Sequence, residues 1–156
     1  MNTTHAINRA VVMTFANMAF VDAEPTPLRP QLSTSERVIG IEFLYPLGGC
    51  IVLHLPTSVK QAVVENIHGV DWQMLGRVQV DDCLTELVNI IAGTFLLLVE
   101  ASEYRQALSA PQIWYSEPTI TTTGELEEYF FLVNNEPAKV ALSFAKAAAS
   151  QHSQAS

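Results

Sequence analysis

The feature that most constrains this chain is an order of helical and extended patterns that occurs twice. In the first half, apolar residues recur at helical spacing over residues 7–18, which predicts a buried helix. Residues 38–45 and 50–55 have strand character and are joined by Pro-Leu-Gly-Gly, which predicts a hairpin. A second apolar stripe at helical spacing follows over residues 58–67. The first half is therefore predicted to be helix, hairpin, helix.

The second half is predicted to follow the same order. A helix is expected from about Asp82 to Leu98, followed by extended segments over residues 112–122 and 127–133 with a Thr-Gly turn between them. An Ala-rich helix is expected over residues 137–149. The order indicates an α+β fold with an antiparallel sheet and helices packed on it.

The two halves suggest a duplication. Half-repeats over residues 5–69 and 78–149 would form one pseudo-twofold domain over residues 1–149, and the small polar residues 150–156 are expected to be a disordered tail. An offset of 72 residues places three first-half positions over second-half ones: Ala10 over Asp82, Thr14 over Glu86 and Asn17 over Asn89. Chance similarity is the alternative explanation of these matches.

The composition narrows the class of partner. The 156 residues carry a formal net charge of −8, the wrong sign for neutralising the phosphates of a nucleic acid. The apolar segment Phe95–Val99 is far shorter than the ~20 residues of a membrane span. Cys50 and Cys83 form no metal-binding or disulfide pattern, and none of the four histidines has metal-ligand spacing. A cytoplasmic protein that binds no metal is expected.

The helix predicted from Asp82 has two different sides at 100° per residue. Its core side holds apolar residues: Leu84, Leu87, Val88, Ile91 and Phe95. A narrow stripe on the opposite side holds Asp82, Glu86, Asn89 and Gly93. An arbitrary Glu-x-x-Asn pair is usually a solvated face. Gly93 permits either the close approach of a partner or the close packing of another helix, and Asp82 is also a typical residue for a helix N-terminus.

The stripe carries a resemblance to a known family. Asp82-x3-Glu86-x2-Asn89, followed by Ile90-Ile91-Ala92-Gly93 and some twenty residues later by Pro111, resembles the active-site signature of the CheC, CheX and FliY phosphatases. These proteins act on CheY-type response regulators. Because the first half has Ala10, Thr14 and Asn17 at the matching positions, this chain is most similar to a single-site CheX-like member.

The resemblance implies a function in chemotaxis or related two-component signalling. It implies hydrolysis of the aspartyl phosphate on a CheY-like receiver domain, with Asn89 orienting the attacking water and Glu86 reaching the conserved lysine of the receiver. Asp82 and Gly93 would contact the partner. No cofactor is expected on this chain, since the Mg2+ would belong to the receiver. The resemblance also implies a possible homodimer. The charge and the short apolar segments indicate no nucleic-acid or membrane partner.

Two other functions are compatible with some of these residues. A non-catalytic CheC-like module could dock a receiver domain or a flagellar-switch protein through the same stripe. An unrelated hydrolase would need a nucleophile in a recognisable context, yet the chain has no Gly-x-Ser-x-Gly elbow. The phosphatase is therefore the preferred hypothesis and the docking module its main rival.

Overall fold

The computed structural model describes residues 2–32, 37–45, 48–99, 107–114 and 126–144. Its helices are α1 (Thr3–Ala19), α2 (Thr57–His68) and α3 (Arg77–Leu98), with a short 3-10 helix, η1 (Trp72–Met74). Its strands are β1 (Ala23–Thr26), β2 (Val38–Tyr45), β3 (Gly49–His54), β4 (Ala107–Leu108), β5 (Gln112–Trp114), β6 (Glu127–Val133) and β7 (Glu136–Phe144). The chain is thus α+β, as predicted.

The strands form one antiparallel sheet that takes its strands from both halves of the chain. Its order is β1-β6-β7-β3-β2-β4, and β5 also pairs with β2. β1 contains Pro25 and lies at an edge, where a residue without a backbone N–H is tolerated. The predicted β2–β3 hairpin is confirmed, with Ile41 opposite Ile51.

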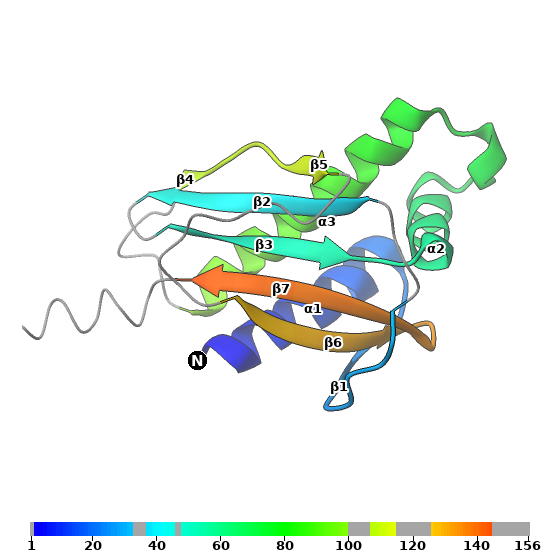
Figure 1. Ribbon diagram of the computed structural model, residues 1–156. Coiled ribbons are helices and arrows are strands. Elements are labelled where there is room, and N and C mark those ends of the chain that lie inside the picture. Colours follow the sequence, from blue (N-terminus) through cyan, green and yellow to red (C-terminus); the bar gives the residue numbers. More distant parts are fainter. Residues whose placement is uncertain (1, 33–36, 46–47, 100–106, 115–125, 145–156) are drawn as a thin grey trace, which may run out of the picture.

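Helices α1 and α3 lie side by side across one face of this sheet, and α2 packs at one end (Figure 1). The core lies between these layers. Side chains at alternate strand positions point toward the helices and are fully buried, among them Ile39, Ile41, Ile51 and Leu53. Phe43 of β2 meets Phe95 of α3, with ring centroids 6.0 Å apart. This contact fixes α3 against the sheet.

The helix predicted over residues 137–149 is wrong for residues 137–144, which form β7. Asn134 and Asn135 have φ values of +50° and +65°, the conformation of a two-residue hairpin turn, and they join β6 to β7. Ala138, Val140 and Leu142 then face the core at strand spacing. Pairing on both sides, with β3 and β6, overrides the helix propensity of alanine. Residues 145–149 lie outside the described part.

The predicted second hairpin is not found among the described residues, which leave out most of its expected first strand, residues 115–122. β5 pairs with β2, and β6 pairs with β7, instead of the two pairing with each other. The predicted Thr-Gly turn and the tail 150–156 lie outside the described residues. The helix–hairpin–helix order is therefore not repeated in the described second half.

The residues that the offset of 72 places over one another differ in burial. Ala10 and Thr14 are buried in the core, whereas Asp82 and Glu86 are exposed. This difference in burial does not support the two matches, which stay predictions. A common ancestor of the two halves stays a hypothesis, and its remaining support is the order of helices and strands along the chain.

Two leucines of α3 provide a matched test of this packing. Leu87 is fully buried and Leu97 is 75% exposed on the same helix. We expect Leu87→Ala to lower the free energy of unfolding by about 2–5 kcal/mol, because it leaves a cavity against the sheet and α1. Leu97→Ala should change it by less than ~0.5 kcal/mol. Urea unfolding followed by circular dichroism measures both, and similar values for the two variants would contradict the orientation of α3.

Candidate functional site

The helix that carries the predicted site is longer than the sequence indicated. α3 begins at Arg77 and runs for 22 residues to Leu98, about 33 Å at 1.5 Å per residue. Gly76 is its N-cap, and the backbone N–H of Gly76 donates to Oε1 of Gln79 over 2.9 Å. This contact closes the first turn five residues before Asp82, the residue at which the helix was expected to start.

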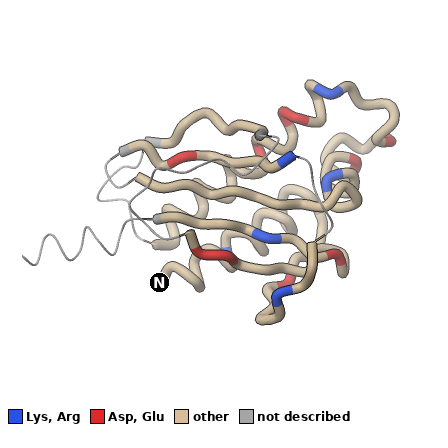
Figure 2. Tube along the Cα trace, viewed as in Figure 1, with Lys and Arg blue, Asp and Glu red and all other residues tan. Residues whose placement is uncertain are grey.

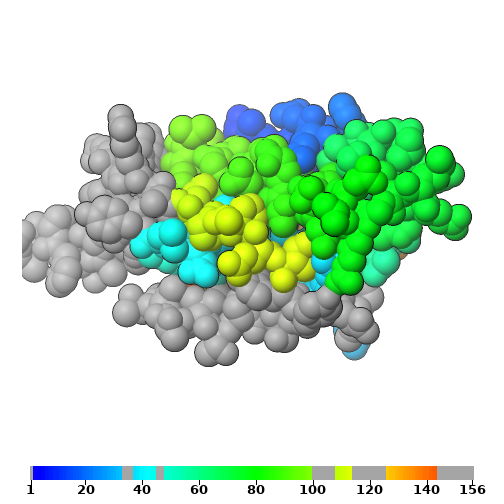
Figure 3. Space-filling view, turned by 90° about the horizontal axis from the view of Figure 1, so that it is seen from above, coloured from blue at the N-terminus to red at the C-terminus, as the bar shows by residue number. Residues whose placement is uncertain are grey.

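One side of α3 is buried against α1, α2 and the sheet, and the other side lies at the surface (Figure 3). The buried side includes the five apolar residues predicted for it, Leu84, Leu87, Val88, Ile91 and Phe95, together with Val80, Cys83 and Ala92. The sequence therefore predicted the orientation of the helix correctly. The opposite stripe faces away from the core.

The stripe presents Glu86 and Asn89 together. Glu86 is exposed and Asn89 is half-buried, and the two are one helical turn apart, about 4.5 Å along the axis. Neither side chain makes a hydrogen bond or an ion pair with another residue of the described part of the chain. A carboxylate acceptor and an amide that can both donate and accept are thus available to a partner. Their catalytic roles stay predictions.

Asp82 does not cap the helix. It lies in the second turn of α3, where its backbone carbonyl accepts a hydrogen bond from Oγ1 of Thr85 over 3.0 Å. The interpretation of Asp82 as a residue of the helix N-terminus is therefore wrong, since the free N–H groups belong to the first turn, after Gly76. Its exposed carboxylate extends the stripe by one turn from Glu86.

Gly93 is not explained by helix packing. A Cβ built at this position would meet nothing within 4 Å, so no neighbouring element of the described part of the chain approaches it closely. Glycine in a helix interior costs up to ~1 kcal/mol relative to alanine. Of the two explanations considered from the sequence, the close approach of a partner is the one compatible with this open space.

Two exposed apolar side chains flank the polar stripe and were not predicted as part of it. Val78 is 72% exposed and Leu97 is 75% exposed. At 100° per residue they lie within about 60° of Asp82, one near each end of the helix. Val78 was missed because the helix was expected to begin after it, and Leu97 was not assigned to either side of the helix from the sequence.

A charged cluster holds the N-terminal half of α3 in place. Nη2 of Arg37, the residue before β2, lies 2.7 Å from Oδ1 of Asp81, and Nε of Arg77 lies 4.0 Å from Oδ2 of the same carboxylate. Nζ of Lys60 on α2 donates to the backbone carbonyl of Arg37 over 2.8 Å. Burial, and then the nearby charge of Arg37, lower the pKa of Lys60, while Asp81 acts in the opposite direction.

The structure gives no metal site of its own in the part it describes. Among those residues, no three His, Cys, Asp or Glu side chains gather closely enough to hold a metal ion. None of the described helices combines the length and the apolar character needed to cross a membrane.

Comparison with known proteins gives no match to a family model and no match to a curated protein. Solved structures do match. CheX from Vibrio vulnificus is 14% identical with a TM-score of 0.75, over 92% of this chain and 97% of that one. A putative chemotaxis protein from Desulfovibrio vulgaris Hildenborough is 17% identical with a TM-score of 0.72, over 92% and 97%.

A third match is the CheX-CheY-BeF3-Mg2+ complex from Borrelia burgdorferi, 16% identical with a TM-score of 0.68, over 93% of this chain and 99% of that one. All three span nearly the whole length of both proteins. The fold implied by the resemblance is therefore confirmed: the chain has the fold of the CheX and CheC-like chemotaxis proteins.

Proposed function

We propose that this chain is a phosphatase that hydrolyses the aspartyl phosphate of a CheY-like receiver domain. The observation that carries the proposal is the Glu86/Asn89 pair, which lies at the surface of α3 in a CheX-like fold. A structural neighbour, the Borrelia burgdorferi CheX, occurs in a complex with CheY, BeF3 and Mg2+. Such a complex supports a receiver domain as the partner.

Hydrolysis of an aspartyl phosphate requires correct positioning of the reactants more than it requires a covalent catalyst. Water attacks the phosphorus in line, a new P–O bond forms, and the bond to the aspartyl carboxylate breaks, which releases inorganic phosphate and the free aspartate. Phosphoryl transfer of this kind is accelerated mainly by alignment and by charge balance on the phosphoryl oxygens. In the proposal, the receiver supplies the Mg2+ and a lysine, and this chain supplies the alignment.

Asn89 suits the alignment of the water. An amide does not titrate at neutral pH, so Asn89 accepts or donates hydrogen bonds but does not act as a general base. Its half-buried position on a helix whose other side is fixed in the core limits the rotamers it can adopt. A restrained amide can hold a water in line better than a freely moving one.

Glu86 suits contact with the receiver. Its exposed carboxylate could pair with the ammonium group of the receiver lysine, and Asp82 one turn earlier adds a second negative charge to the same stripe. The open space at Gly93 would let the receiver backbone approach α3 closely. The net charge of −8 would also favour encounter with a partner that presents a positive surface.

The docking module remains the alternative, since an exposed stripe can bind without catalysis. Loss of the Asn89 amide distinguishes the two functions. A docking module would still function as long as the receiver binds, whereas the phosphatase would no longer align the attacking water.

We expect the wild-type chain to accelerate phosphate loss from a Mg2+-bound phosphorylated receiver present in excess. Asn89→Ala should slow this reaction about 10²- to 10⁴-fold, the contribution of a well-placed catalytic group. Glu86→Ala should slow it about 10- to 100-fold, through loss of one charge-assisted contact. The measurement is the decay of radiolabelled phosphoreceiver at one salt concentration, with receivers from the same genome tried in turn.

The matched control is Asn17→Ala, which makes the same substitution at an exposed position of α1 and should leave the rate unchanged. Circular dichroism establishes that each variant is folded. A receiver that binds tightly but loses phosphate no faster with wild-type chain would overturn the phosphatase and support the docking module.

Gly93→Ala should have opposite effects on stability and activity. Because the added methyl group meets open space, the free energy of unfolding should rise, by up to ~1 kcal/mol. The phosphatase rate should fall by about tenfold or more, because the methyl group holds the receiver away from Asn89 and small misplacements are costly. Thermal unfolding and the decay assay measure the two effects. A gain in stability with an unchanged rate would show that the receiver does not approach Gly93.

A further inference from the structure

Two large apolar side chains lie on the solvent side of α3, Val78 near its start and Leu97 near its end. The solvent side of an amphipathic helix is ordinarily polar. α3 has no charged residue after Glu86, so Leu97 lies in the uncharged half of the helix (Figure 2). One exposed apolar residue is common on proteins and indicates nothing by itself. The positions of these two on the helix are what relate them to the proposed site.

Both side chains lie in line with the proposed catalytic pair. At 100° per residue, Val78 is about 20° from Asn89 around the helix axis, and Leu97 is about 20° from Glu86. Along the axis, at 1.5 Å per residue, each is about 14 Å from the midpoint between Glu86 and Asn89. The polar pair is therefore centred between two apolar side chains that are about 28 Å apart.

The size of a specific protein contact brings both apolar side chains under a partner. Such an interface covers roughly 800 Å² of each protein, which corresponds to a circle of about 16 Å radius. A partner centred on Glu86 and Asn89 therefore reaches Val78 and Leu97, which are each about 14 Å from that centre. The same partner that engages the polar pair would bury both apolar side chains.

The backbone holds both side chains in place before a partner binds. Val80, two residues after Val78, is buried, and Leu97 lies between Phe95 and Val99, which are fully buried. Residues on a fixed helix lose little conformational freedom on binding, so the free energy gained by burying their apolar surface is not offset by ordering of the backbone. Both positions are therefore suited to anchor a partner.

From this arrangement we propose that Val78 and Leu97 are the anchors by which the chain selects its receiver domain, an inference that rests on the proposed function. The matching receiver has an apolar patch on each side of its phosphorylated aspartate, and the two patches are about 28 Å apart. A receiver with a charged side chain at either place would lose an anchor and bury an unpaired charge, so it would bind more weakly. Hydrolysis depends on the middle of the stripe, and selection of the receiver depends on its ends.

The first test measures affinity without hydrolysis. The receiver is activated with BeF3 and Mg2+, the components found with CheY in the Borrelia burgdorferi complex, and binding is followed by calorimetry. We expect Val78→Ala and Leu97→Ala each to weaken binding about tenfold, because each removes apolar surface from the contact. The two positions are too far apart to interact, so the double variant should bind about a hundredfold more weakly.

Both variants should fold, because the two side chains are largely exposed and alanine favours a helix. Leu97→Met, which restores the apolar surface, should return the affinity to within about threefold of the wild-type value. Higher salt should weaken wild-type binding through the acidic residues of the stripe, whereas the ratio of the wild-type affinity to that of Leu97→Ala should stay constant. A constant ratio identifies the Leu97 contact as apolar.

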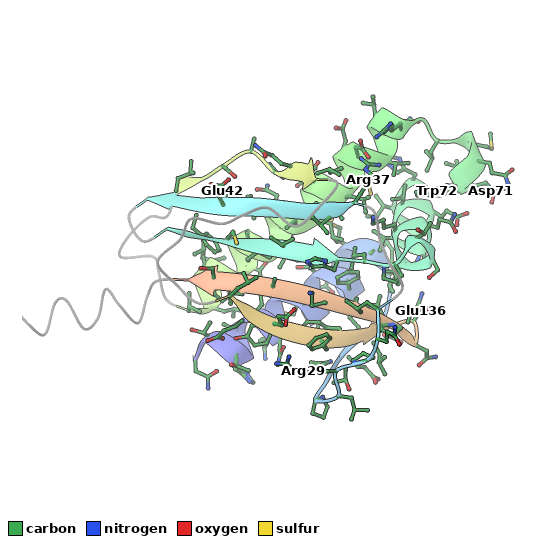
Figure 4. The ribbon with its side chains drawn as sticks, in the orientation of Figure 1. Arg29, Arg37, Glu42, Asp71, Trp72 and Glu136 are labelled. Atoms are coloured by element: carbon green, nitrogen blue, oxygen red, sulfur yellow. The ribbon has the colours of Figure 1, made fainter. Side chains whose placement is uncertain are left out.

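Leu28 provides the matched control. It is 72% exposed, close to the 75% of Leu97, and it follows β1, which is far from β2 in the order of the sheet. In Figure 4, Arg29 is labelled near β1, whereas Arg37, which pairs with Asp81 of α3, is labelled near the start of β2. Leu28→Ala removes the same atoms as Leu97→Ala and should change the affinity for the receiver less than about twofold.

The decay assay distinguishes anchoring from catalysis. Val78→Ala and Leu97→Ala should raise the concentration of phosphoreceiver that gives half the maximal rate about tenfold, with the effect on the maximal rate below about twofold. Asn89→Ala should show the opposite pattern, with a lower maximal rate and nearly unchanged affinity. If wild-type chain does not hydrolyse the phosphate, yet the receiver binds and both anchor variants bind more weakly, the anchors are supported and the phosphatase is overturned.

Three results would overturn the anchors. One is an affinity that neither variant changes, or that Leu28→Ala lowers equally; the phosphatase stands in that case if the rate still depends on Asn89. The second is a dimer of the chain alone that Leu97→Ala converts to a monomer in analytical ultracentrifugation, with no loss of affinity for the receiver. Leu97 would then belong to a contact between two copies of the chain. The third is that no receiver from the same genome binds, which would overturn both proposals.

Discussion

The packing of α3 is the constraint on which the rest of the structure depends. Its buried side carries eight residues into the core, where they meet α1, α2 and the sheet. Phe95 contacts Phe43 of β2, so the helix is fixed to this strand of the sheet as well as to its neighbouring helix. Rotation of α3 would expose this apolar surface to water, at a free-energy cost of about 25 cal/mol for each Å² exposed. The polar stripe is therefore held in position by the residues on the opposite side.

Side-chain periodicity explains how much of the site could be predicted from the sequence. The buried side of α3 and the stripe opposite it both follow from the 100° step of a helix, and the structure confirms them. The start of the helix could not be placed, because Gly76 and Gln79 form its first turn without the acidic or hydroxyl residues that usually mark an N-terminus. As a result Val78 and the true position of Asp82 were missed.

Strand pairing in the tertiary structure explains why the helix predicted over residues 137–149 was wrong for residues 137–144. Residues 137–144 are rich in alanine, and their local preference is helical. In the fold they are the middle strand between β3 and β6, and every residue from Pro137 to Phe144 has a cross-strand partner. The asparagine turn at 134–135 was the local signal that could have indicated this hairpin. The charged cluster around Asp81 could not be predicted from any local pattern, because Arg37, Lys60 and Arg77 come together only when three segments of the chain pack.

Two neighbouring carboxylates show how one helix can serve two surfaces. Asp81 and Asp82 are adjacent in sequence, yet a step of about 100° sends their side chains to different sides of α3. Asp81 is engaged by Arg37 and Arg77, and Asp82 is exposed on the stripe. A pair that is about one-quarter exposed contributes modestly to stability, roughly 1 kcal/mol or less. Its greater effect is geometric, because it joins the residue before β2 to the turn of α3 from which the stripe begins. The orientation of the proposed catalytic surface therefore depends in part on the ion pair that Asp81 makes on the other side of the helix.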